Sequence, residues 1–151
     1  PKYLETGVYI PKPSVTTISN AMDVGDPSNF ARILEIHNGD WDAVKASIVG
    51  YSYSDAQTEV GMMDVITRTG YLMEPHGVIG YMALKEYQKQ HDVQGIVLET
   101  AHPAKFGDVV EPVIGQKIEV PERLQEFMRR KKVATLINAD FKELKDYLLS
   151  K

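Results

Sequence analysis

The fold is decided by residues 95–106, which read GIVLETAHPAKF. The first half, Gly95 to Thr100, is a short apolar run after a predicted helix, which is the pattern of a buried strand in a parallel sheet. The second half is a loop at the carboxyl end of that strand, where open α/β sheets bind their ligands. The segment therefore predicts an α/β fold with a ligand site in this loop.

Two predicted helices precede the strand. Ser54 is placed to cap the first of them, with Gln57 three residues later as in a capping box, and Gly70 ends it. The second begins at Pro75, a residue favoured in the first helical turn, and runs to about His91. This order, helix and then strand, is typical of an αβ unit.

The N-terminal quarter mixes short helices with extended segments. Residues 3–7 read as the end of a helix that Gly7 terminates. Residues 14–19 are rich in β-branched side chains and predict a short strand. Asp26 is predicted to cap a helix that starts at Pro27, and Asp40 to start another.

The C-terminal residues predict two more helices. One follows Glu122 and is closed by the cations 129–132, which favour the negative end of a helix. These four cations are either a solvated helix end or a phosphate or nucleic-acid site, although they fall short of the longer blocks typical of interaction tails. The last predicted helix, 139–149, buries apolar residues. These are Phe141, Leu144 and Leu148.

Composition excludes several classes of protein. Of the 151 residues, 43% are hydrophobic and 25% charged, which is typical of a globular domain. The net charge of −4 argues against a chain-wide cationic surface for nucleic acid or a membrane. There is no cysteine, so disulfides, thiolate metal sites and cysteine nucleophiles are excluded, and a reducing, cytoplasmic setting is expected.

Histidine spacing gives no metal site, because none of the four histidines has a second one three to five residues away. Two other segments carry candidate chemistry. Glu74 to Gly77 opens a helix, and is either a simple helix start with close packing or part of a site. Thr100 to Pro103 is either turn chemistry or a ligand loop.

Several motifs together resemble threonine synthase. They are the segments 70–81 (GYLMEPHGVIGY) and 98–106 (LETAHPAKF), with further likeness at 2–7 and 20–30. The resemblance covers essentially the whole chain. That family consists of pyridoxal-phosphate enzymes of the fold type shared with tryptophan synthase β. It converts O-phospho-L-homoserine and water into L-threonine and phosphate.

The resemblance implies the helix-rich C-terminal part of a fold-type-II enzyme, with an incomplete parallel sheet. The implied parts are an extended lead-in 1–25, a helical segment 26–91, a strand and cofactor-site loop 94–106, and C-terminal helices 107–151. The family's Schiff-base lysine and its Gly-Asn-Phe-Gly phosphate loop lie upstream, and neither motif occurs here. The chain is therefore expected to be a fragment that has no catalytic residue of its own and is inactive alone.

The resemblance also assigns site residues. Thr100 matches the residue that hydrogen-bonds the pyridine nitrogen of the cofactor, where a neutral hydroxyl tempers the electron sink that an aspartate would strengthen. Lys105, with His102 in the same loop, is a candidate for the substrate phosphate, or alternatively a partner for a carboxylate. Ser28 and Asn29 lie at a predicted helix N-terminus and are either an anion site or helix caps.

Two alternatives stay open. One is another enzyme of the same fold type, such as a threonine or serine dehydratase, and the other is a non-catalytic helical interaction domain. The expected ligand is a small molecule, with neither nucleic acid nor membrane as partner. A single strand cannot satisfy its own backbone groups, so partner strands are expected outside these residues, and the isolated chain is expected to self-associate.

Overall fold

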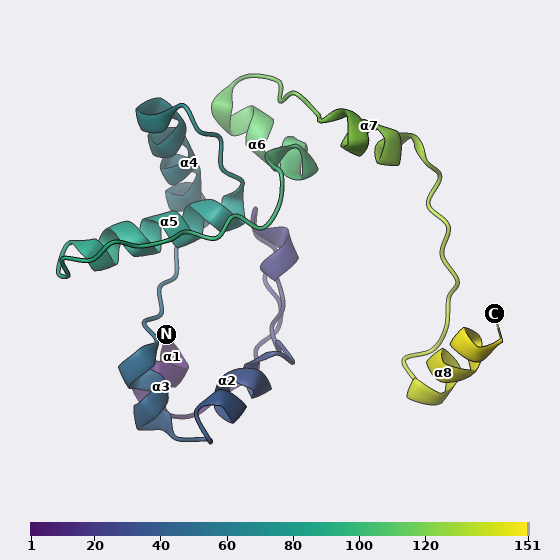
Figure 1. Ribbon diagram of the computed structural model, residues 1–151, viewed down its shortest axis with the longest axis horizontal. Helices are drawn as coiled ribbons and strands as arrows, with labels where there is room; N and C mark the ends of the chain where they lie inside the picture. Colours follow the sequence, from purple (N-terminus) through teal and green to yellow (C-terminus); the bar gives the residue numbers. More distant parts are fainter. Residues whose placement is uncertain (151) are drawn as a thin grey trace. The chain divides into compact units, whose positions relative to one another are not determined.

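Within residues 1–150, which the computed structural model describes, regular structure is entirely helical (Figure 1). The elements in chain order are α1 (Lys2–Thr6), η1 (Asn20–Met22), α2 (Phe30–Ile36), α3 (Trp41–Ser47), α4 (Asp55–Thr69), α5 (Pro75–Gln88), η2 (Pro103–Phe106), α6 (Gly107–Ile114), α7 (Glu122–Arg129) and α8 (Phe141–Leu149). Residues 1–119 make one unit, and the residues from Val120 onward make a second. None of the described helices is long and apolar enough to cross a membrane.

The two longest helices begin where the sequence predicts. Ser54 Oγ accepts the Gln57 N–H at 3.3 Å, and the Gln57 side chain accepts the Ser54 N–H at 2.9 Å, which confirms the capping box of α4. Gly70 ends α4 with a φ of 70°, a left-handed conformation that glycine adopts without strain. Pro75 occupies the first turn of α5, where a missing N–H costs no helical hydrogen bond.

The core of the first unit lies between α4, α5 and α6. Its buried members are Met62, Val65, Met73, Val78 and Val110. Val78 and Val110 have no exposed surface, and Phe106 of η2 packs against the cluster. The residue pattern gave no bounds for α6, although the resemblance implies C-terminal helices over residues 107–151. The helix α6 packs against η2. Because Val110 of α6 and Val78 of α5 belong to the same core, the loop after residue 100 is held close to α5.

The helices α1, α2 and α3 form a separate group in Figure 1. The Trp41 indole N–H donates to the Tyr3 carbonyl at 3.1 Å, which ties α3 to α1. Asp40 caps α3 as predicted, accepting the N–H groups of residues 42 and 43. The predicted start at Pro27 is wrong, because α2 begins at Phe30 and the Asp26 carboxylate accepts the Tyr9 hydroxyl at 2.9 Å instead of capping a helix.

No strand forms among the described residues, so the predicted strands at 14–19 and 95–100 are wrong for this structure. Both segments are non-helical. A strand is stabilised by hydrogen bonds to a neighbouring strand, and none lies beside either segment within residues 1–150. As a result, Ile96 and Leu98 are 89% and 79% exposed. The helix-rich part of the predicted fold is confirmed, whereas the incomplete parallel sheet is not seen.

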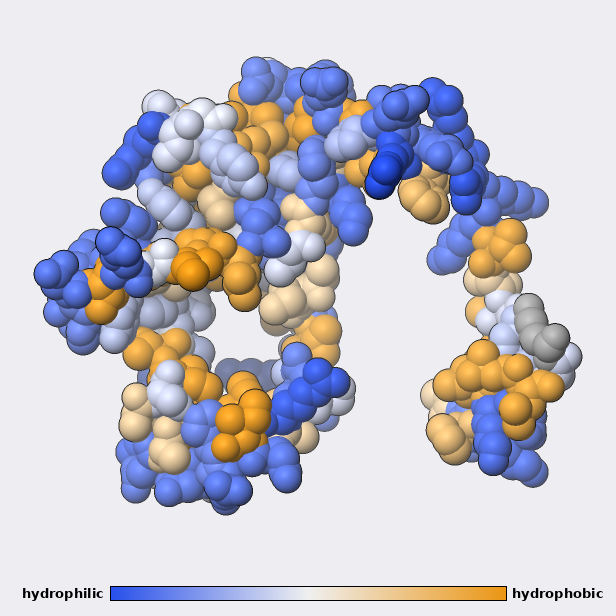
Figure 2. Space-filling view, viewed as in Figure 1, coloured by the Kyte–Doolittle hydropathy of each residue, from blue (hydrophilic) through white to orange (hydrophobic). Residues whose placement is uncertain are grey.

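The second unit contains α7 and α8 and buries little. Phe141, Leu144 and Leu148 were predicted to be buried, but all three are exposed. About thirty residues enclose too little volume for a hydrophobic core. Figure 2 shows hydrophobic side chains on the surface of this unit. The cations 129–132 are also exposed, as expected of a solvated helix end.

Candidate functional site

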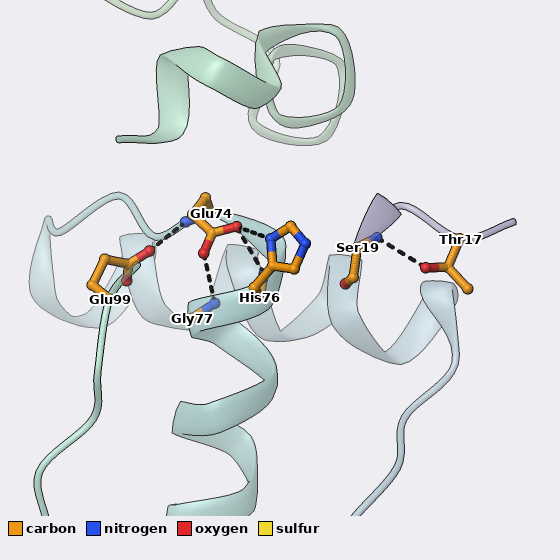
Figure 3. A network of polar contacts seen from close by, with 6 residues as sticks. All are labelled: Thr17, Ser19, Glu74, His76, Gly77 and Glu99. Atoms are coloured by element: carbon orange, nitrogen blue, oxygen red, sulfur yellow. Dashed lines mark hydrogen bonds and ion pairs between the residues drawn. The ribbon is translucent and has the colours of Figure 1, made fainter. Parts of the chain in front are cut away.

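A buried carboxylate organises the start of α5. Glu74 has no exposed surface and precedes the helix as its N-cap. Its Oε1 accepts the Gly77 N–H at 3.0 Å, and its Oε2 accepts the His76 N–H at 2.9 Å (Figure 3). These two N–H groups have no partner inside the helix, so the carboxylate supplies the hydrogen-bond acceptors that the first turn of α5 lacks.

The same carboxylate orients the imidazole of His76. The ring Nδ1 contacts Glu74 Oε2, and because a carboxylate only accepts, Nδ1 carries the hydrogen. The other ring nitrogen, Nε2, is buried and has no hydrogen-bond partner among the described residues. The ring lies 4.9 Å, centroid to centroid, from that of Phe106. His76 therefore connects the start of α5 to the loop that ends in η2.

Glu99 approaches this cluster from the extended segment. Its Oε1 accepts the Glu74 backbone N–H at 3.3 Å, while its Oε2 is buried without a hydrogen-bond partner in the part of the chain described. Burial raises the pKa of the Glu99 carboxyl, against the lowering effect of that hydrogen bond, and the nearby Glu74 carboxylate raises it further. The cluster therefore favours the protonated form of Glu99 more than water does.

The loop after Glu99 presents three predicted site residues. Thr100 is exposed, and its hydroxyl makes no hydrogen bond to any residue from 1 to 150. His102 caps η2, since its Nδ1 accepts the Ala104 N–H at 3.1 Å. Lys105 is exposed and forms no ion pair with a described residue. The structure thus brings Thr100, His102 and Lys105 into one loop, next to the Glu74 cluster.

Ser28 and Asn29 lie elsewhere in the first unit. They precede α2, which belongs to the group with α1 and α3 in Figure 1. Asn29 is the N-cap residue, but its side chain makes no capping hydrogen bond. Their predicted contact with the substrate phosphate stays a prediction.

Glu99 was not predicted as a site residue, and the sequence indicated no chemical role for Glu74 or His76. The available signal was the alternation of side chains in an extended segment, which puts Glu99 on the face opposite to Thr100. Metal binding has no candidate within residues 1–150, because no three metal-ligating side chains gather there. The loop can form hydrogen bonds through the Thr100 hydroxyl, the Lys105 ammonium group and the His102 imidazole. The buried Glu74 carboxylate lies in the cluster next to it.

The α5 segment, the loop and the C-terminal helices match a known class. Residues 78–148 match the family model described as threonine synthase, C-terminal. These residues are therefore similar to the C-terminal domain of threonine synthase.

Similarity to individual proteins extends over the whole chain. It is 40% identical to the threonine synthase of Haemophilus influenzae, over 99% of this chain and 34% of that protein. The crystal structure of threonine synthase from Escherichia coli matches with a TM-score of 0.77 at 32% identity, over 99% of this chain and 34% of that one. Pyridoxal-phosphate-bound threonine synthase from Brucella melitensis matches with a TM-score of 0.64 at 28% identity, over 97% of this chain and 37% of that one.

The chain spans about a third of the length of the relatives it matches. These matches identify it with the C-terminal part of threonine synthases, which confirms the resemblance that the motifs around His76 and Thr100 indicate.

Proposed function

We propose that this chain is the C-terminal part of an enzyme that converts O-phospho-L-homoserine and water into L-threonine and phosphate. The observation that carries the proposal is the similarity of the entire chain to threonine synthases. The preceding part of the enzyme supplies the lysine that binds the cofactor and the loop that holds the cofactor phosphate. It also supplies strands beside residues 95–100, and the complete enzyme works in the cytoplasm.

The loop after Glu99 fits a site for pyridoxal phosphate. The fit rests on the hydroxyl of Thr100, which is exposed and has no hydrogen-bond partner among residues 1–150. When bound, pyridoxal phosphate supplies an electron sink. The Thr100 hydroxyl would hydrogen-bond the ring nitrogen without adding a charge, and would therefore leave that nitrogen largely neutral.

Lys105 and His102 serve the substrate in this proposal. The phosphate of O-phospho-L-homoserine needs cationic or N–H donors, and the Lys105 ammonium group is a free donor of this kind. The cap on η2 fixes the His102 ring through Nδ1, so in the neutral ring the hydrogen sits on Nε2. That N–H is available as a second donor from the same loop.

Phosphate release tests the function. The chain is produced together with the preceding part of its enzyme, and phosphate release from O-phospho-L-homoserine is compared with that of the 151-residue chain alone. Only the complete enzyme is expected to release phosphate and form threonine, and the chain alone is expected to show no single borohydride-trapped pyridoxyl-lysine. Release of ammonia from threonine or serine instead would identify a dehydratase, and absence of cofactor binding would favour an interaction domain.

Substitution of Thr100 tests its role in the complete enzyme. Thr100→Val keeps the shape and removes the hydrogen bond, which is worth about 0.5–1.5 kcal/mol in cofactor binding. Turnover is expected to fall further than cofactor affinity, because the electronics of the ring matter most in the transition state. Thr100→Ser is the matched control and retains most activity. Wild-type turnover in Thr100→Val would remove Thr100 from the site.

A further inference from the structure

The extended segment 95–100 runs along α5 in a defined register. A methyl group added at Gly80 would lie 3.6 Å from Val97 Cγ1, and one added at Gly77 would lie 2.4 Å from Glu99 Oε2. Val97 and Glu99 therefore face α5, at Gly80 and Gly77, which lie one helical turn apart. Because side chains alternate in an extended chain, Thr100 is directed away from α5.

The Glu99 carboxyl holds the end of this segment against α5. One oxygen accepts the Glu74 backbone N–H at 3.3 Å, and the other is buried without a hydrogen-bond partner among residues 1–150. Beside it lies the Glu74 carboxylate, which already accepts the N–H groups of His76 and Gly77. Two neighbouring carboxylates repel, so the Glu74 carboxylate makes the charged form of Glu99 less favourable. Burial raises the pKa of Glu99, and the nearby Glu74 carboxylate raises it further.

We infer that Glu99 is a positioning residue for Thr100. Its carboxyl fixes the end of the extended segment to the N-terminus of α5, and the next residue then presents its hydroxyl at the start of the loop. The inference rests on the proposed function, in which Thr100 contacts the ring nitrogen of the cofactor. Glu99 itself touches neither cofactor nor substrate.

Four variants of the complete enzyme separate position from chemistry. Glu99→Ala removes the anchor, whereas Glu99→Gln keeps the size of the side chain and an oxygen that can accept the Glu74 N–H. Gly77→Ala leaves the carboxyl intact but displaces it, because the new methyl group would overlap Glu99 Oε2. Gly80→Ala is the matched control on the same helix face, since its methyl group lies at an ordinary contact distance from Val97.

The measurements are the dissociation constant of pyridoxal phosphate, the absorption spectrum of the bound cofactor and the thermal midpoint of the cofactor-free enzyme. Losing the effect of one hydrogen bond weakens binding about 2- to 13-fold. We expect this loss in Glu99→Ala and Gly77→Ala, with a changed cofactor spectrum. Glu99→Gln and Gly80→Ala are expected to bind pyridoxal phosphate with a change smaller than the smallest of these losses.

A double variant decides the inference. If Glu99 acts through Thr100, adding Glu99→Ala to Thr100→Val causes no further loss of cofactor affinity. Losses that multiply would overturn the inference and make Glu99 a general structural residue. Wild-type affinity in Glu99→Ala would also overturn it.

Failure of the proposed function has different signatures. Wild-type cofactor affinity in Thr100→Val overturns both the role of Thr100 and the positioning role of Glu99. No cofactor binding by the complete wild-type enzyme overturns the proposed function itself. If Glu99→Ala does not fold, Gly77→Ala replaces it in the double variant, with Gly80→Ala as control, and the same outcomes apply.

Discussion

Met62 offers a direct test of the core that supports the loop. It is 1% exposed and sits on α4 against α5 and α6. Met62→Ala removes three heavy atoms, which corresponds to about 2.4 kcal/mol of lost burial at about 0.8 kcal/mol per group. The cavity left behind adds to this, so we expect a total loss of about 2–5 kcal/mol in the free energy of unfolding. Denaturant unfolding, followed by circular dichroism, measures it.

The neighbouring Met63 is the matched control, because it is on the same helix but 40% exposed. Met63→Ala is expected to change the free energy of unfolding by less than about 1 kcal/mol, since the site is open and alanine favours a helix. Equal effects of the two substitutions, or a loss below about 1 kcal/mol for Met62→Ala, would refute the packing described for this core.

Three further outcomes are expected. Ser54→Ala removes the capping box of α4 and lowers the free energy of unfolding by about 0.5–2 kcal/mol, measured by denaturant titration; an unchanged midpoint would contradict the cap. The isolated chain is expected to self-associate through Ile96 and Leu98, which are 89% and 79% exposed, and a monomer at all concentrations in sedimentation would contradict this. Burial raises the pKa of Glu99 above its unfolded value, so its stabilising contribution is full below the unfolded pKa and is lost as the pH rises through the folded pKa. We expect the free energy of unfolding to fall as the pH rises between these two pKa values. Glu99→Gln is expected to reduce this fall, and denaturant unfolding at a series of pH values measures it.

Helix boundaries were predictable where they depend on neighbouring residues. The capping box at Ser54, the cap at Asp40 and the left-handed glycine at Gly70 are set within four residues, and all are present. The start of α2 was predicted wrongly because Asp26 does not cap the helix. Its carboxylate accepts the hydroxyl of Tyr9, which is seventeen positions away in the sequence. The resemblance implies helices over residues 107–151, but the residue pattern gave no bounds for α6, whose interior contains Pro112.

The candidate site was predictable only in part. Thr100, His102 and Lys105 share one loop, so their proximity follows from the sequence. The cluster of Glu74, His76 and Glu99 joins residues twenty-five positions apart, and only the path of the extended segment along α5 brings them together. A strand at residues 95–100 depends on neighbouring strands, so an apolar run alone does not determine it.

The close approach of residues 77 and 99 also restricts how the sequence can diverge. Because a methyl group at position 77 would lie 2.4 Å from the Glu99 carboxyl, a larger residue at 77 requires a shorter one at 99. Position 80 has no such restriction, since a methyl group there lies 3.6 Å from Val97. Among related sequences, positions 77 and 99 are therefore expected to vary together. Position 80 is expected to be either glycine or alanine, independently of the residue at position 97.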